Sequence, residues 1–282
     1  MNNFIDDGYA HVELSMGLCH YKLDGPEDGT LLLLIHGATV PAWEFDRLVP
    51  YLDELGYRTL RVDLYGHGYS DRPMVQYDIA LFVGQMFELL NSLGIAEPIH
   101  VLGHSLGAAV GAAMACLRPQ SIDCLVLAAP LVNYTGRMPV IRLLNIPVIG
   151  EVMMSAYVMP MLIRRRSRRY REIEDGRFVQ KFMRQLAKPG FDRALLSLFR
   201  GGTLGNQLAL YKNAALSKVP TLILRGEHDA IVSREQVRQL ADSMPHARVV
   251  EVAATAHAFM LTDPQAVAPV LKSFLGKCST VS

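Results

Sequence analysis

The first 130 residues alternate between short apolar runs and segments in which apolar positions recur at helical spacing. Helical spacing occupies 41–56 and 77–93, and residues 10–22 predict a β-hairpin or two short strands ahead of the first run. Apolar strands that alternate with helices are typical of a parallel sheet covered on both faces. The apolar runs are 30–36 ("TLLLLIH"), 57–64 ("YRTLRVDL"), 98–103 ("PIHVLG") and 122–130 ("IDCLVLAAP").

A different pattern begins after Pro130. Residues 131–215 contain no convincing strand, and five of the 13 methionines of the chain lie between positions 138 and 161. Strand and helix alternate again from 219 to 275. We therefore predict an α/β fold with a doubly wound, mostly parallel eight-stranded sheet. Residues 1–130 and 216–282 would form this core domain, and residues 131–215 would be inserted into it as a helical cap.

Composition and charge add few constraints. The chain has 282 residues, 50% of them hydrophobic, and a formal charge of +1, so it can bury a sizeable core and has no general attraction to nucleic acid. Its four cysteines lack C-x-x-C spacing, which predicts free thiols in a reducing compartment. The start, "MNNFIDDGYA", does not resemble a signal peptide, and prolines and polar residues interrupt the apolar region 138–163. We expect no transmembrane segment and a cytoplasmic location.

The motif "GHSLG" at 103–107 lies between an apolar run and a helix of small residues. A strand-to-helix reversal this tight strains the backbone of Ser105 and requires flanking residues without bulk, which Gly103 and Gly107 supply. The strain holds the hydroxyl clear of the sheet edge, at a helix N-terminus whose N–H groups stabilise negative charge. The phosphate-binding patterns G-x-G-x-x-G and G-x-x-x-x-G-K-[ST] do not occur in the sequence. Ser105 is therefore the candidate nucleophile.

A serine hydroxyl needs a base to remove its proton, and this kind of fold places the acid and then the histidine after the serine. Downstream of Ser105 the histidines are His228, His246 and His257. His257 lies in a loop between the last predicted strand and the last helix, where a base can lie over the sheet edge. His246 precedes a strand and belongs at the opposite end. His257 is therefore the candidate base.

The acid is expected where the penultimate strand ends. "LILRGEHDAIVS" places Glu227 and Asp229 just beyond the apolar run, and the apolar pattern resumes at Ala230. This pattern favours a loop that folds back inward after Asp229, with Glu227 and His228 facing solvent. Asp229 is the candidate acid, although a carboxylate here also fits a turn or a helix cap.

Two backbone N–H groups are needed to bind the oxyanion of an acyl-transfer intermediate. One is expected from the residue after the nucleophile, Leu106, and the other from Ala38 in the loop after the early central strand. Gly37 lets that loop approach a bound carbonyl closely. We expect His36 to be a structural hydrogen-bonding residue rather than a second base.

The sequence resembles the α/β-hydrolase superfamily along nearly its whole length. The matching segments are "HGAT", "DLYGHGYSDRP", "GHSLG", "GEHDAIV" and "AHAFMLTDP", in the order of the family. The resemblance implies a Ser105–Asp229–His257 triad, oxyanion donors at Ala38 and Leu106, and a lid formed by 131–215. It assigns the second segment to a structural turn without chemistry. Ala256 stands where the family usually has glycine before the base.

Within this superfamily the leading interpretation is a carboxylesterase or lipase acting on an ester or lactone of a small or medium hydrophobic substrate. Serine at the elbow argues against the haloalkane dehalogenase and epoxide hydrolase branches, which use aspartate there. Carbon–carbon bond hydrolases usually carry glycine and proline after the H-G, where this chain has "ATVPAW". Such a hydrolase and a non-catalytic ligand-binding protein remain the alternatives.

The predicted cap contains flexible apolar residues that could line a substrate site or simply pack the cap onto the core. The candidates for substrate contact are Met138, Met153, Met154 and Met159. The run "RRRSRRYR" at 164–171 could meet anionic headgroups, but such runs are more often the solvated face of a helix, so peripheral membrane contact is not favoured. No cluster has metal-ligand spacing, so we expect neither metal nor other cofactor. The sequence leaves the oligomeric state open.

Overall fold

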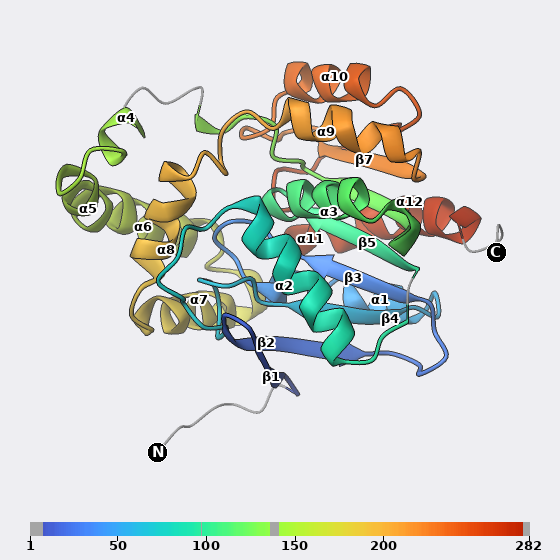
Figure 1. Cartoon of the computed structure of the whole chain (residues 1–282), viewed down its shortest axis with the longest axis horizontal. Helices are drawn as coiled ribbons and strands as arrows, with labels where there is room; N and C mark the ends of the chain where they lie inside the picture. Colours follow the sequence, from blue (N-terminus) through green and yellow to red (C-terminus); the bar gives the residue numbers. More distant parts are fainter. Residues whose placement is uncertain (1–7, 97, 136–140, 279–282) are drawn as a thin grey trace.

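The computed structural model describes residues 8–96, 98–135 and 141–278 (Figure 1). Its eight-stranded sheet has the order β1-β2-β4-β3-β5-β6-β7-β8. β2 pairs antiparallel with β1 and β4, and the other neighbouring strands are parallel. This arrangement confirms the predicted doubly wound α/β fold. In order, β1 to β8 are Ala10–Leu14, Gly17–Asp24, Leu31–Ile35, Arg58–Val62, Ile99–His104, Ile122–Ala128, Thr221–Gly226 and Arg248–Val252.

The two faces of the sheet pack against separate apolar cores. In β3, Leu31, Leu33 and Ile35 join one core, while Leu32 and Leu34 join the other. Successive side chains of a strand point to opposite faces, so burial on both sides produces the unbroken apolar runs of the sequence. The helices of the first face are α2 (Ile79–Ser92), α3 (Leu106–Leu117), α9 (Leu208–Ala214) and α10 (Arg234–Ser243). Those of the second face are α1 (Val49–Asp53) and α12 (Pro264–Cys278), with the short α11 (Phe259–Thr262) beside them.

The segment between β6 and β7, which we call the helical insertion (residues 131–215), contains only helices in its described part, 131–135 and 141–215. Its helices α4 to α8 gather beyond one end of the sheet (Figure 1). Among the residues that the structure describes, no helix is both long and apolar enough to cross a bilayer. The insertion begins with α4 (Ile141–Leu144), α5 (Ile149–Met153), the π-helical turn η4 (Met154–Val158) and α6 (Met159–Arg169). It continues with η5 (Ile173–Gly176), α7 (Arg177–Ala187), α8 (Phe191–Arg200) and α9.

The predicted helix over 41–56 is instead two short elements, the 3₁₀ turn η1 (Ala42–Phe45) and α1. Pro50 explains the interruption, because it lacks an N–H and its ring clashes with the carbonyl four residues earlier in a continuous helix. Trp43 and Leu48 consequently do not share one face. The Trp43 ring packs 4.9 Å from Phe178 of the helical insertion, whereas Leu48 joins the core beneath the sheet.

The expectation of four free thiols is wrong for one pair of cysteines. Cys124 in β6 and Cys278 at the end of α12 form a disulfide with their Cα atoms 6.2 Å apart. The two cysteines are separated by 154 positions in the sequence, and no spacing signal could have revealed the pairing. Cys19 and Cys116 are free.

Close packing around the corner at Ser105 predicts that a methyl group added at Gly107 would destabilise the fold strongly. A Cβ atom at Gly107 would lie 2.0 Å from the carbonyl oxygen of Ile35, which is backbone and cannot move aside. We expect Gly107→Ala to lower the unfolding free energy by about 3 kcal/mol or more, and the thermal midpoint by roughly 6 °C or more. Gly84→Ala in α2 is the matched control, because a Cβ there meets nothing within 4 Å and should stabilise the helix slightly. Equal midpoints for the two variants in a thermal melt would contradict this reading.

Candidate active site

Ser105 lies at the strained corner between β5 and α3. Its φ of 52° and ψ of −108° place a non-glycine residue in a region that L-residues rarely adopt. The corner is fixed from the neighbouring strand, because Ser105 N–H donates to the Ala128 carbonyl at 2.9 Å and the Ser105 carbonyl accepts from Leu131 N–H at 3.0 Å. Ser105 as a whole residue is partly exposed.

Asp229 and His257 meet at the same edge of the sheet, after β7 and β8. Asp229 Oδ2 lies 2.8 Å from His257 Nδ1, while Oδ1 accepts the N–H groups of Ile231 and Val232 at 2.8 and 2.9 Å. The inward fold of the loop at 230–232 that the sequence predicts is therefore what orients the carboxylate. Glu227 does not reach this pair and accepts Ala254 N–H at 2.8 Å.

The charges of this pair are set by burial and by their contact. Burial lowers the pKa of His257 below its ordinary value of 6.5, although Asp229 opposes the shift. Burial would raise the pKa of Asp229, but the hydrogen bond and charge of His257 and two backbone N–H groups hold it below 3.8. At neutral pH the imidazole is therefore neutral and the carboxylate ionised. The Nδ1 proton then points to Asp229, which leaves Nε2 as an acceptor.

The loop after β3 approaches Ser105 closely and is fixed through its backbone. A Cβ atom at Gly37 would lie 3.3 Å from Ser105 Cβ. Gly37 N–H donates to Glu44 Oε1 at 3.0 Å, and the Ala38 carbonyl lies 2.7 Å from His67 Nε2. Among the described residues, nothing accepts a hydrogen bond from the N–H of Ala38 or of Leu106. These two predicted oxyanion donors therefore have no acceptor within the described part of the protein, although Leu106 itself is fully buried.

Two buried histidines support this loop as neutral groups. His36 Nδ1 lies 2.6 Å from the Gly37 carbonyl and Nε2 accepts Leu64 N–H at 2.9 Å, so both ring nitrogens are occupied by backbone. Burial lowers the pKa of His67 to about 4, and the neighbouring His36 acts in the same direction. Neither histidine is placed to act as a base, as expected for His36.

Glu44 and His104 form a buried pair that no pattern in the sequence indicates. Glu44 Oε1 lies 3.1 Å from His104 Nδ1, and both side chains are at most 5% exposed. His104 Nε2 lies 2.9 Å from the carbonyl of His257, which can only accept, so this nitrogen carries a proton. Burial acts against a charged imidazole, but the charge and hydrogen bond of Glu44 prevail and raise the pKa of His104. The pair joins the loop of Gly37, the residue before Ser105 and the loop of His257.

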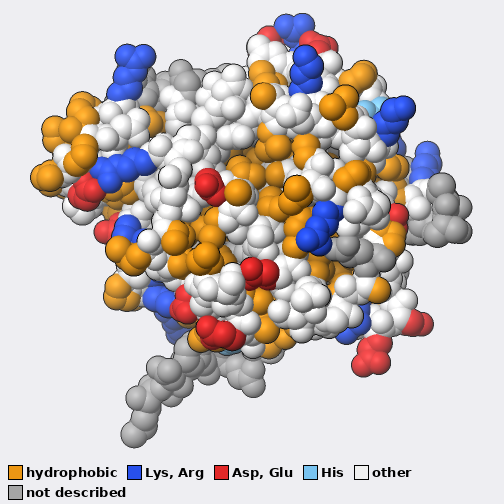
Figure 2. Space-filling model, in the orientation of Figure 1, with side chains coloured by type: hydrophobic (Ala, Val, Ile, Leu, Met, Phe, Trp, Pro, Cys, Tyr) orange, Lys and Arg blue, Asp and Glu red, His pale blue; other side chains and the backbone are white. Residues whose placement is uncertain are grey.

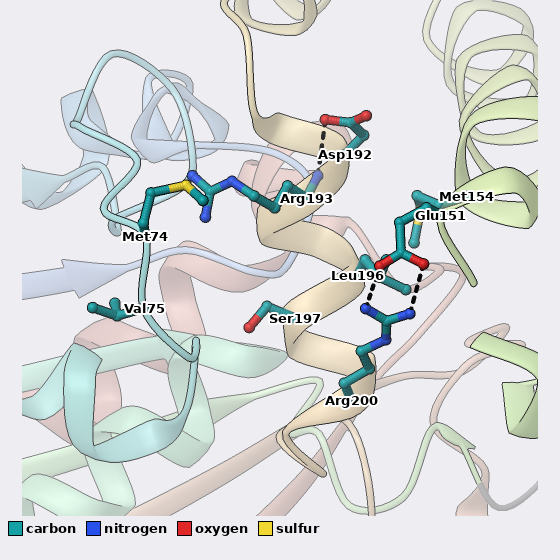
Figure 3. Close-up of a pocket in the computed structure, with 9 residues that line it drawn as sticks. All are labelled: Met74, Val75, Glu151, Met154, Asp192, Arg193, Leu196, Ser197 and Arg200. Carbon is teal, nitrogen blue, oxygen red and sulfur yellow. Dashed lines mark hydrogen bonds and ion pairs between the residues drawn. The ribbon is translucent and has the colours of Figure 1, made fainter. Parts of the chain in front are cut away.

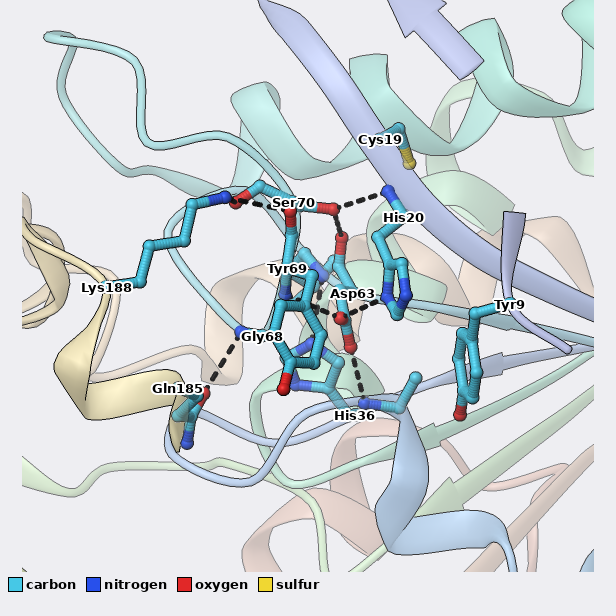
Figure 4. Close-up of polar contacts among 12 residues, drawn as sticks. Tyr9, Cys19, His20, His36, Asp63, Gly68, Tyr69, Ser70, Gln185 and Lys188 are labelled. Carbon is cyan, nitrogen blue, oxygen red and sulfur yellow. Dashed lines mark hydrogen bonds and ion pairs between the residues drawn. The ribbon is translucent and has the colours of Figure 1, made fainter. Parts of the chain in front are cut away.

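A second buried network holds the turn after β4 against the same region (Figure 4). Asp63 accepts from Ala42 N–H and Tyr69 N–H, each at 2.9 Å, and lies 2.6 Å from His20 Nδ1. Its bond to Ala42 fixes the 3₁₀ turn that carries Glu44. The turn therefore has the structural role expected from the resemblance.

The helical insertion contacts the loops beside Ser105 through α6 and α7. An apolar cluster joins it to the loops after β3 and β8, and its core members are Val40, Trp43, Tyr170, Phe178, Phe182, Ala258 and Leu261. Gln185 of α7 donates to the Thr39 carbonyl and accepts Gly68 N–H, both at 3.0 Å. Arg166 of α6 donates to Thr39 Oγ1 at 2.5 Å, and its charge also lowers the pKa of His257. The insertion thus contacts both loops that flank Ser105.

The four methionines proposed for substrate contact have different positions. Met138 lies outside the described residues. Met153 and Met159 are partly buried against the main core, and Met154 is 1% exposed. Met154 also lines a cavity of about 460 Å³ between the loop of Met74 and helices α5 and α8 (Figure 3). Ser105 does not line this cavity, so a substrate role for the methionines stays a prediction.

Comparison with known proteins places the chain among hydrolases. The family model described as "alpha/beta hydrolase fold" matches residues 30–264. Lipase 1 of Psychrobacter immobilis is 27% identical over 262 residues, which cover 90% of this chain and 79% of the lipase. A hydrolase structure from Pseudomonas aeruginosa is 26% identical, with a TM-score of 0.73 and coverage of 96% of this chain and 99% of that one. The enol-lactonase of Burkholderia xenovorans LB400 is 21% identical, with a TM-score of 0.78 over 95% and 100% of the two chains, and so shows the same fold.

The Glu44–His104 pair predicts a pH-dependent contribution to stability. Because the pKa of His104 is raised in the folded protein, its contribution is complete below pH 6.5 and is lost as the pH rises through the folded pKa. Glu44→Gln should therefore lower the thermal midpoint more near pH 6 than near pH 9, whereas the exposed control Glu54→Gln should have little effect at either pH. Thermal melts across this range test it, and a deficit that grows with pH would contradict the charged pair.

Proposed function

The chain belongs to the α/β-hydrolase fold family, and on this premise we propose that it is a serine hydrolase. Its substrate would be a carboxylic ester or lactone of small or medium hydrophobic character, cleaved through an acyl-enzyme on Ser105. The observation that carries the proposal is the strained, partly exposed Ser105 at the sheet edge where the buried Asp229–His257 pair also lies. A serine held in this conformation at an energetic cost is typical of a nucleophile.

In the first step, the Ser105 hydroxyl attacks the ester carbonyl carbon and His257 Nε2 takes its proton. A new carbon–oxygen bond forms and the carbonyl π electrons move to the oxygen. The Asp229 carboxylate, fixed by two backbone N–H groups, holds the imidazole in the required tautomer and stabilises its charged form. Return of the proton to the leaving alcohol completes formation of the acyl-enzyme.

The N–H groups of Ala38 and Leu106 would bind the oxyanion. Both lack an acceptor among the described residues, and the close approach of Gly37 to Ser105 brings their segments together. Each such donor contributes roughly 10²–10³ in rate. Water, deprotonated by His257, then attacks the acyl carbon, and Ser105 leaves with the proton from the imidazolium.

Two observations support the proposal of a hydrophobic substrate: an apolar cluster beside the site and the name of a relative. Val40 lies two residues after Ala38, and Ala258 directly follows His257. Both belong to the apolar cluster that includes Phe178 and Phe182 of α7. The Psychrobacter protein that is 27% identical to this chain is named a lipase. Residues 131–215 would act as a cap that excludes water from the acyl-enzyme.

A covalent probe tests the nucleophile directly. We expect an alkyl fluorophosphonate to add once to the wild-type protein and not to Ser105→Ala, with nitrophenyl ester hydrolysis lost in the same variant. Asp229→Asn should retain the adduct but hydrolyse about 10⁴-fold more slowly, because the imidazole adopts the wrong tautomer. Intact mass and initial rates from acetate to palmitate provide the measurements. If the wild type neither forms an adduct nor hydrolyses any ester, the protein is a ligand-binding member of the family.

The lowered pKa of His257 predicts the shape of the pH–rate profile. Activity requires the neutral imidazole, so kcat/KM should rise with pH through a midpoint below 6.5 and stay level through neutral pH. Asp229 opposes the shift, so the residual activity of Asp229→Asn should have a still lower midpoint. Initial rates with nitrophenyl acetate from about pH 4 to about pH 8 measure both, and a wild-type midpoint above 7 would exclude His257 as the base in this environment.

A further inference from the structure

Exposed apolar side chains concentrate on one part of the helical insertion. Seven of the fifteen large hydrophobic side chains that are exposed in the described residues lie within 143–161. Val148 and Tyr157 are the most exposed of them, at 73% and 74%. Residues 145–149, "NIPVI", comprise the turn after α4 and the first residue of α5, and all five are exposed. The full set is Leu143, Ile146, Val148, Ile149, Val152, Tyr157 and Met161.

Four of these exposed apolar residues, from Ile149 to Met161, lie on one continuous helix. α5, η4 and α6 follow one another without a break in helical backbone, from Ile149 to Arg169. The exposed apolar positions of this helix, from Ile149 to Met161, precede its exposed arginines. The π-helical turn η4 adds the extra residue that keeps Val152, Tyr157 and Met161 at successive exposed turns. The helix is about 30 Å long at 1.5 Å per residue.

Arginines occupy the exposed positions of the second half. Arg164, Arg165, Arg168 and Arg169 are exposed, at the spacing of one helical face, while Arg166 points inward to Thr39. No carboxylate among the described residues forms an ion pair with any of these four. The only acidic residue between 143 and 163 is Glu151, whose charge is paired with Arg200 at 2.6 Å. The exposed helix therefore carries an apolar half and a cationic half.

The charge of the whole insertion strengthens this contrast. Residues 131–215 contain 15 lysines and arginines and 5 acidic residues, a net charge of +10. The rest of the chain contains 13 and 22, a net charge of −9, which together give the +1 of the chain. The neutral total thus conceals a strongly cationic insertion on an anionic core.

We propose that this surface, residues 143–169, docks the protein onto an anionic lipid surface. The "NIPVI" turn and the apolar half of the helix would enter the headgroup region, and the four arginines would meet phosphate groups. In Figure 2, hydrophobic side chains gather where Figure 1 draws α4 and α5, with Lys and Arg side chains beside them. The inference goes beyond the proposed function, because it requires no turnover.

The chemistry of the surface favours a lipid over other partners. A second copy docking through the same surface would bring the two arginine sets together, and like charges repel. Nucleic acid would match the arginines but leave the apolar turn in water. An anionic interface alone accepts both halves, because it offers negative charge at its surface and hydrocarbon beneath it.

Vesicle flotation of the full-length chain tests the proposal. We expect the wild type to float with phosphatidylcholine–phosphatidylglycerol vesicles at low salt, and not with phosphatidylcholine vesicles. Arg164→Gln, Arg165→Gln, Arg168→Gln and Arg169→Gln combined should lower partitioning by about 100-fold or more, since each cation adds roughly fivefold. Val148→Asn, Val152→Gln and Tyr157→Gln combined should also weaken it. The control set neutralises exposed cations elsewhere, at Lys212, Lys218, Arg248 and Lys272.

Thermal midpoints equal to that of the wild type ensure that each variant is folded. The same assay on Ser105→Ala separates docking from catalysis, because loss of the nucleophile should leave flotation unchanged. Equal binding to neutral vesicles, no binding to anionic ones, or equal loss in the control set would overturn the proposal. Concentration-dependent dimers that disappear in the Val148, Val152 and Tyr157 variant, seen by sedimentation without vesicles, would also overturn it and identify a second copy as the occupant.

Discussion

The buried pair of Glu44 and His104 connects the three loops on which the candidate site depends. The Glu44 carboxylate accepts hydrogen bonds from Gly37 N–H and from Nδ1 of His104, the residue directly before Ser105. The Nε2 of His104 donates to the His257 carbonyl. His104 is the last residue of β5, whereas Gly37 and His257 lie in loops beyond the ends of β3 and β8, where no strand pairing holds them. An ion pair with several defined partners specifies position more strictly than apolar contact, and removing either partner would leave an uncompensated buried group.

The helical insertion is joined to this framework unevenly. α7 is fixed by Gln185, which bonds to Thr39 and Gly68, and by the apolar cluster around Phe178 and Phe182. The hairpin of α4 and α5 instead exposes apolar side chains at its turn. α7 therefore contacts the loops at the sheet edge, whereas the turn between α4 and α5 is exposed to solvent. α6 has both kinds of contact, because Arg166 bonds to Thr39 while the arginines on either side of it are exposed.

The sheet could be predicted from the sequence because its five central strands, β3 to β7, are mostly buried and give clear apolar runs. The strained serine and the Asp229–His257 contact followed from chain order and from the apolar pattern around each residue, and the geometry agrees with both. Glu44 could not be found in this way. A lone acidic residue between Trp43 and Phe45 looks like a solvent-facing helical position, and only the 3₁₀ turn directs it inward. The Cys124–Cys278 pairing depends on tertiary contact and has no local pattern.

The π-helical turn η4 makes the insertion sensitive to length as well as to composition. It contains one residue more than an α-helical turn, and each residue rotates the helix by about 100°. Deletion of a single residue here would change no charge and remove little apolar surface. It would nevertheless turn the arginines of α6 away from the side on which Val152 and Ile149 lie, and Arg166 away from Thr39. A related chain that lacks one residue at this turn would thus have nearly the same composition, but its arginines would point in a different direction from its apolar side chains.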